Sequence, residues 1–122
     1  LKNVELVGQK SGQDLQDFIL RSRLLVVPSV WHENAPLSVV EAKAHSKVII
    51  AFAMGGISEI LPPELLVEPK NVLELARKIK IWFEADATKL ASMGSHLQSE
   101  AKQNNSPEVY LGRLLKVYKN EK

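Results

Sequence analysis

The chain has 122 residues, of which 45% are hydrophobic and 25% are charged, a balance typical of one folded domain large enough to hold a core. Sixteen basic and fourteen acidic residues leave a net charge of +2, which is too weak to indicate a nucleic-acid partner or an acidic membrane surface. The absence of cysteine excludes disulfides and thiolate metal sites and fits a reducing compartment such as the cytoplasm.

Four short apolar runs have the composition of β-strands. They are rich in valine, leucine and isoleucine, and two of them are nearly continuous, which is typical of strands buried on both faces of a parallel sheet. We expect strands at Val4–Val7, Leu24–Pro28, Val48–Phe52 and Leu65–Glu68.

Helical patterns lie between these runs. Ser11 and Asp14 predict a capping box before a helix near residues 13–23. Pro36 suits the first turn of a helix that runs to about residue 46, and a short helical turn is expected at Ile57–Leu61.

After the last predicted strand the sequence becomes helical. Asn71 and Asp86 predict two helix N-caps, and Ser106 followed by Pro107 predicts a third. Alternating strands and helices followed by terminal helices predict an α/β fold. We expect a partial doubly wound, Rossmann-like parallel sheet of about four strands with C-terminal helices, in a single domain over residues 1–122. If strands are missing before Val4–Val7, one sheet edge is left open, and we hypothesise that the chain forms a homodimer through this exposed edge.

Two glutamates eight positions apart, Glu33 and Glu41, mark a candidate site. The loop that holds Glu33 follows a strand and leads into a helix N-terminus, where free backbone N–H groups favour an anion. Pro36 has no N–H, so the useful donors are those of Leu37 and Ser38.

The helix after this loop is expected to turn Leu37, Val40 and Ala44 toward the sheet, which would leave Glu41 half-buried at the border of that stripe. A half-buried carboxylate needs a hydrogen-bond partner, and ligand hydroxyls would serve. Pairing with a nearby lysine or arginine, or reaching solvent, is the commoner arrangement when spacing alone is considered. In the loop, Trp31 is expected to pack rather than to lean over a ligand.

Residues 26–61 contain an ordered set of short motifs: a strand ending in Pro28-Ser29, then Glu33, Glu41-Ala42, an apolar strand, and Gly55-Gly56 with Glu59. This set resembles the donor-binding segment of retaining GT-B glycosyltransferases, the glycosyltransferase 4 or "group 1" family. The pair of glutamates alone is weak evidence, but the ordered set is much more specific, and weaker similarity extends toward both ends of the chain.

The resemblance implies a UDP- or GDP-linked nucleotide-sugar as donor, no separate cofactor and no metal. Glu33 corresponds to the glutamate that contacts the donor sugar near the transferring carbon, and it is the candidate catalytic residue. Glu41 corresponds to the glutamate that accepts hydrogen bonds from the ribose hydroxyls. The other implied donor-binding residues are Asn34, Ala35, Pro36, Leu37, Gly55 and Gly56. The two glycines either permit a close backbone approach or merely form a tight turn, and the sequence favours neither.

The resemblance also implies parts that we do not find in this sequence: the arginine and lysine that clamp the diphosphate, and the N-terminal domain that binds the acceptor glycan. Ser46 and Val48 stand where the family commonly has glycine and proline, and both changes are expected to affect the turn more than the chemistry. We therefore expect the later part of a C-terminal donor-binding domain, inactive alone. The full enzyme would be a hexosyltransferase of polysaccharide biosynthesis, in the cytoplasm or peripheral at the inner face of the membrane.

Two other functions stay open. The chain could be a non-catalytic Rossmann-like binding or assembly module that kept the motif. It could also bind another nucleotide, which is disfavoured because no G-x-G-x-x-G follows a strand.

Overall fold

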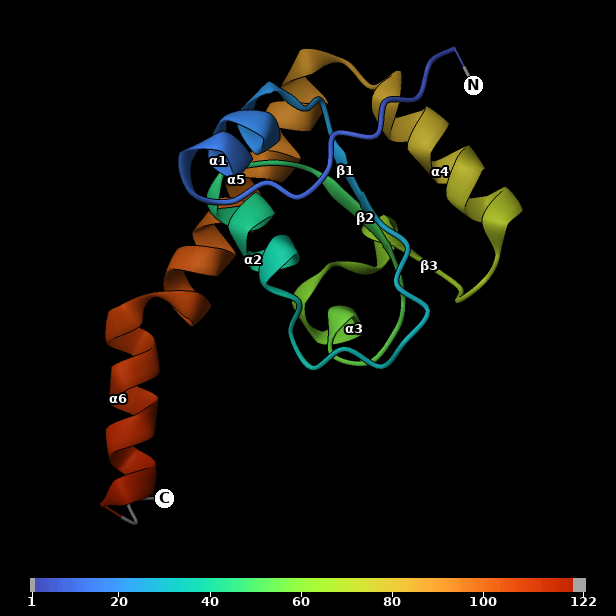
Figure 1. Cartoon of the computed structure of the whole chain (residues 1–122). Helices are drawn as coiled ribbons and strands as arrows, with labels where there is room; N and C mark the ends of the chain where they lie inside the picture. Colours follow the sequence, from blue (N-terminus) through green and yellow to red (C-terminus); the bar gives the residue numbers. More distant parts are fainter. Residues whose placement is uncertain (1, 120–122) are drawn as a thin grey trace.

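Three parallel strands in the order β1-β2-β3 form the sheet of the computed structural model, which describes residues 2–119 (Figure 1). They are β1 (Leu25–Val27), β2 (Ile49–Phe52) and β3 (Leu66–Val67). The register places Val26 opposite Ile50 and Phe52 opposite Val67. The predicted α/β class with a parallel sheet and C-terminal helices is confirmed.

The helices lie on both sides of this sheet. In chain order they are α1 (Gly12–Arg21), α2 (Leu37–Ala44), α3 (Ile57–Ile60), a 3-10 turn at Pro63–Leu65, α4 (Val72–Phe83), α5 (Ala87–Asn105) and α6 (Pro107–Tyr118). Figure 1 shows α2 and α5 together on one side and α4 on the other, while α6 contacts α5 and extends away from the body. Within residues 2–119, no helix is long and apolar enough to cross a membrane.

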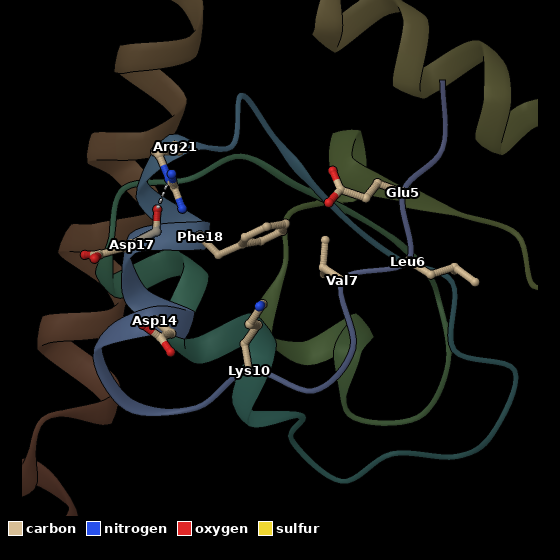
Figure 2. A pocket seen from close by; sticks show the side chains of 8 residues that line it. All are labelled: Glu5, Leu6, Val7, Lys10, Asp14, Asp17, Phe18 and Arg21. Carbon is tan, nitrogen blue, oxygen red and sulfur yellow. Dashed lines mark hydrogen bonds between the residues drawn. The ribbon is translucent and has the colours of Figure 1, made fainter. Parts of the chain in front are cut away.

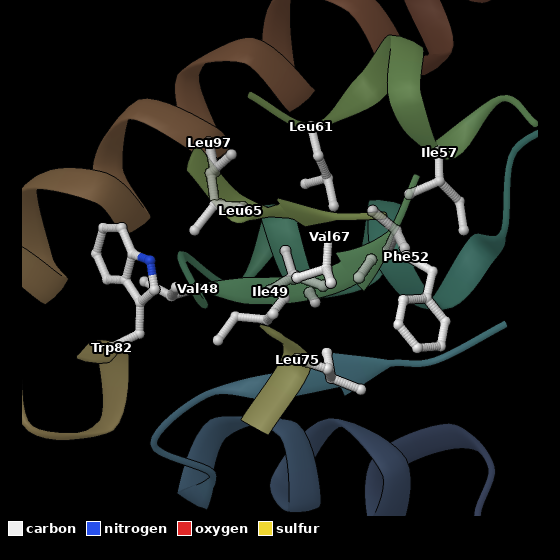
Figure 3. Packing of buried hydrophobic residues seen from close by; sticks show 14 residues of the cluster. Val48, Ile49, Phe52, Ile57, Leu61, Leu65, Val67, Leu75, Trp82 and Leu97 are labelled. Carbon is white, nitrogen blue, oxygen red and sulfur yellow. The ribbon is translucent and has the colours of Figure 1, made fainter. Parts of the chain in front are cut away.

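The central strand explains why the apolar runs are continuous. All four residues of β2 are buried, because β2 has a strand on each edge and helices over both faces. Figure 3 shows its neighbours in the core, among them Leu75 and Trp82 of α4 and Leu97 of α5. The two edge strands are shorter and less buried.

Three predicted N-caps are confirmed. In each, a side-chain oxygen accepts a hydrogen bond from a backbone N–H of the first turn, which satisfies a donor that the helix cannot. The pairs are Asn71 with Glu74 at 3.0 Å, Asp86 with Lys89 at 2.8 Å, and Ser106 with Val109 at 3.3 Å. Ser11 is the N-cap of α1, but its side chain makes no capping hydrogen bond, so the predicted capping box is wrong there.

The predicted strand at Val4–Val7 is also wrong. This segment has no regular secondary structure and pairs with no strand among the described residues, and Leu6 is 96% exposed. A strand is stabilised by hydrogen bonds to a neighbour, and apolar composition alone does not supply one. The segment instead runs beside α1, where Val7 and Phe18 line one pocket of about 610 Å³ (Figure 2). The sheet therefore has three strands here rather than about four.

Candidate functional site

Two loops meet at the carboxyl edge of the sheet. The loop after β1 carries Glu33 and leads into α2, and the segment after β2 carries Gly55 and Gly56 and leads into α3. The Gly56 N–H donates to the Glu33 carbonyl oxygen at 2.7 Å. This is the edge at which open α/β sheets bind ligands.

The glycines permit a close approach between the loops. A methyl group on Gly56 would overlap the Asn34 carbonyl group, and one on Gly55 would press against the Glu33 backbone. Gly55 also has a φ of +54°, a conformation that side chains other than glycine disfavour. The tight turn is therefore present, and it brings the two loops close together; a close approach to a donor stays a prediction.

The Glu33 side chain is half-buried and held from within its own loop. Its Oε1 accepts a hydrogen bond from the Ser29 hydroxyl at 3.0 Å. A carboxylate has two oxygens, so one can be fixed while the other meets a ligand. Trp31 is 72% exposed, so the expectation that it packs is wrong.

The start of α2 faces the same region. Pro36 is the N-cap and is buried, and its carbonyl accepts from the N–H groups of Val39 and Val40 at 3.0 and 3.4 Å. The N–H groups of Leu37 and Ser38 come before these and have no intrahelical acceptor. Since Leu37 is 75% exposed, the first turn of α2 is open to solvent.

The rotation of α2 differs from the expected one. The buried residues are Val39, Ala42 and Lys43, whereas Leu37 and Ala44 are exposed. The predicted stripe is therefore wrong, and so is the half-burial of Glu41, which is exposed. The buried positions have the spacing i, i+3 and i+4, but the lysine at the third made that face look polar.

Glu41 lies apart from the two loops. Its side chain lines a pocket of about 120 Å³ between α1 and α2. The other lining residues are Gly12, Leu15, Gln16, Ile19 and His45. The structure thus brings Glu33 and Asn34 against the two glycines and places Ala35, Pro36 and Leu37 directly after them. Glu41 lines a separate pocket, and no sequence motif indicated that α1 forms its other side.

One buried cation was not foreseen. Lys43 is 3% exposed, and its Nζ donates to the Ile60 carbonyl at 2.7 Å. The sequence pattern that could have predicted it is a lysine four residues after Val39, on the same helix face as Val39 and Ala42. Within residues 2–119, no cluster of three or more histidine, aspartate or glutamate side chains is arranged to hold a metal ion.

Comparisons with known proteins agree on a family. The sequence model of the family "Glycosyl transferases group 1" matches residues 1–104. A curated relative, an uncharacterized glycosyltransferase of Methanocaldococcus jannaschii, is 38% identical over 82 residues, which cover 65% of this chain and 23% of the relative.

Two solved structures share the fold. A glycosyltransferase from Rickettsia africae is 26% identical with a TM-score of 0.81, over 90% of this chain and 30% of that protein. The Anabaena protein HepE, solved in complex with UDP-glucose, is 23% identical with a TM-score of 0.80, over 89% of this chain and 30% of that one. The chain therefore spans less than a third of the relatives that it matches.

Proposed function

The chain belongs to the group 1 glycosyltransferase family, and we propose that it forms the donor-binding part of a retaining enzyme. The donor would be a UDP- or GDP-linked sugar, and the acceptor a glycan or lipid-linked sugar bound elsewhere in the whole protein. The observation that carries this proposal is the junction of the Glu33 loop with Gly55 and Gly56, directly before the N-terminus of α2.

Glu33 is proposed to meet the sugar. Its Oε1 is held by Ser29, which fixes the side chain rotamer at the mouth of the junction. A fixed carboxylate positions a sugar hydroxyl without losing further side-chain entropy on binding, and positioning is a large part of catalysis by such enzymes.

The diphosphate is proposed to face the start of α2. Its oxygens would accept from the backbone N–H groups of Leu37 and Ser38, with the Asn34–Pro36 backbone around them. The positive end of the helix favours a charge that grows as the sugar departs. Stabilising this leaving group is the contribution that the chain can make to the chemical step.

Glu41 is proposed to bind the ribose. Its side chain lines the pocket between α1 and α2, and a carboxylate can accept hydrogen bonds from two neighbouring hydroxyls. The exposed carboxylate of Glu41 is accessible to ribose hydroxyls, which would supply the hydrogen-bond donors.

Titration calorimetry with UDP and UDP-glucose, repeated with GDP and GDP-mannose, tests these roles separately. Glu41→Ala should weaken both UDP and UDP-glucose by about tenfold, as expected for a lost hydrogen bond to a charged group. Glu33→Gln should weaken UDP-glucose while leaving UDP unchanged. Glu84→Ala, on the surface at the end of α4, is the matched control. Equal affinity of the unaltered chain and Glu41→Ala for every nucleotide would count against the assigned role.

We further propose that the chain binds a donor without transferring sugar, because it spans less than a third of its relatives and the acceptor site and cationic clamp would belong to the rest of the protein. Incubation with radiolabelled UDP-glucose and a glycan acceptor should give no transfer. Measured turnover by the 122-residue chain would contradict this. A chain that binds no sugar nucleotide would favour the non-catalytic assembly module instead.

A further inference from the structure

Lys43 is a buried lysine on the inner face of α2. It sits on the buried face of α2 beside Val39 and Ala42, both 0% exposed. Taking an ammonium group out of water is unfavourable unless hydrogen bonds and charge compensate it. The contacts of its Nζ therefore indicate what the charge does there.

The shortest contact of Lys43 is with α3. Its Nζ donates to the Ile60 carbonyl at 2.7 Å, whereas Glu100 Oε2 of α5 lies farther away, at 3.4 Å. Ile60 is the last residue of α3, and carbonyls at a helix end have no partner within the helix. The ammonium thus binds the negative end of α3, and the Glu100 carboxylate of α5 balances its charge.

The helix α3 needs such support. It has only four residues, and a single helical turn is unstable by itself. Its N-cap Gly56 is bonded to Glu33, and its first residue, Ile57, is buried. Its end is fixed by Lys43, which stands two residues after Glu41.

We propose that Lys43 is a positioning residue of the donor site. Its bond to Ile60 fixes the position of α3, and of the Gly55-Gly56 loop before it, relative to α2. The helix α2 carries the other proposed donor-binding residues, Leu37 and Glu41. The proposal rests on the proposed function, since it takes the donor site as given. It assigns Lys43 no contact with the donor itself. Lys43 would act on the donor indirectly, through the Gly55-Gly56 loop, whose Gly56 N–H is bonded to Glu33.

The test compares Lys43→Met with a matched control, Lys78→Met. Lys78 Nζ also donates to a backbone carbonyl, that of Leu66 at 2.6 Å, but at the start of β3 and hence at the opposite edge of the sheet. Two readouts are measured on the 122-residue chain and its variants: hydrogen exchange of the backbone amides at residues 55–61, and affinity for UDP-glucose. Circular dichroism establishes that each variant is folded.

We expect Lys43→Met to speed exchange at residues 57–61 and to weaken UDP-glucose by about fivefold to tenfold. Lys78→Met should do neither. Lys43→Arg, which keeps a cationic donor, should restore part of the affinity, and it keeps the proposal testable if the methionine variant does not fold. Unchanged exchange at residues 57–61, or equal effects of the two methionine variants, would overturn the proposal. The exchange measurement needs no ligand, so failure of the unaltered chain to bind a sugar nucleotide would defeat the proposed function and leave this readout to decide the role of Lys43.

Discussion

The backbone N–H of Gly56 donates to the carbonyl oxygen of Glu33 at 2.7 Å, so the loops that follow β1 and β2 are joined through their main chains. The contact is so close that the Asn34 carbonyl fills the space where a side chain at Gly56 would stand. The two loops can therefore come this close only because residue 56 is a glycine and has no side-chain carbon.

Gly56→Ala should separate the two loops. Relieving the overlap with Asn34 requires a backbone shift, for which we expect a loss of about 1–3 kcal/mol in the free energy of unfolding. UDP-glucose affinity should fall as well. Gly112→Ala is the control, because Gly112 lies in α6 with open space around it, and alanine there should stabilise the helix by up to about 1 kcal/mol. Urea unfolding and titration calorimetry measure both effects, and an alanine at 56 without consequence would contradict the close contact.

Ser46→Gly should stabilise the chain. Ser46 has a φ of +56° at the end of α2, where the N–H of Lys47 binds the Ala42 carbonyl and the N–H of Ser46 binds that of Lys43. This is a Schellman motif, whose left-handed residue is usually glycine. We expect a gain of about 1 kcal/mol in the free energy of unfolding for glycine, and no gain for the matched Ser46→Ala. Stabilisation by both substitutions would show that backbone conformation is not the cause.

Trp31 should report ligand binding by fluorescence. It is exposed two residues before Glu33, whereas Trp82 is buried with Lys89 Nζ over its ring at 4.8 Å. A donor at the junction should change the polarity around Trp31 alone. UDP-glucose should therefore alter the emission of the unaltered chain and of Trp82→Phe, but not of Trp31→Phe. A response that survives Trp31→Phe would place the ligand elsewhere.

Within residues 2–119 no strand pairs with the outer edge of β1, which makes the hypothesised homodimer testable. The Leu25 N–H binds the Val48 carbonyl at 2.9 Å, and successive N–H groups alternate in direction, so that of Val26 faces away from β2. Val26→Pro removes this outward donor and keeps the bonds to β2. Light scattering over a wide concentration range should detect a dimer that Val26→Pro weakens. A monomer at every concentration would rule the dimer out.

The ion pair between Glu74 and Arg77 should make stability depend on pH. Two hydrogen bonds, at 2.7 and 2.9 Å, lower the pKa of the Glu74 carboxyl and raise the pKa of Arg77. Because the folded-state pKa of Glu74 is lowered, its contribution is present above the unfolded pKa, about 4.3, and is lost as pH falls through the folded value. Urea midpoints of the unaltered chain and Glu74→Gln should therefore differ at pH 7 and converge at lower pH. The same comparison is made in the Arg77→Gln background. If Glu74→Gln changes the urea midpoint there by the same amount, the ion pair is not the cause of the pH dependence.

Local rules predicted much of the fold. The N-caps at Asn71, Asp86 and Ser106 follow from residue type and spacing, because each oxygen binds an N–H three residues later. The strand β2 follows from a continuous apolar run that needs burial on both faces. Val4–Val7 has similar composition but no neighbour, and strand formation depends on residues far away in sequence.

The candidate site was predicted in its parts but not in its orientation. Motif order gave the Glu33 loop and the glycines, and the structure joins them. The rotation of α2 could not be obtained from periodicity, because two stripes compete: Leu37 with Val40 and Ala44, and Val39 with Ala42 and Lys43. Choosing the second requires knowing that Ile60 offers a carbonyl to the buried ammonium, which is a tertiary contact.

Most residues proposed to meet the donor lie on the Glu33 loop, the glycine loop and the first turn of α2, at one edge of the sheet, while the largest fully buried side chains, such as Ile49 and Leu97, lie in the strands and helices behind. Substitutions at Trp31, Ala35 or Leu37 alter exposed positions and leave the interior unchanged. Side chains at these positions can therefore change without disturbing the core. Gly56 is the exception, because its backbone joins the Glu33 loop to the loop after β2, so a side chain there would disturb both.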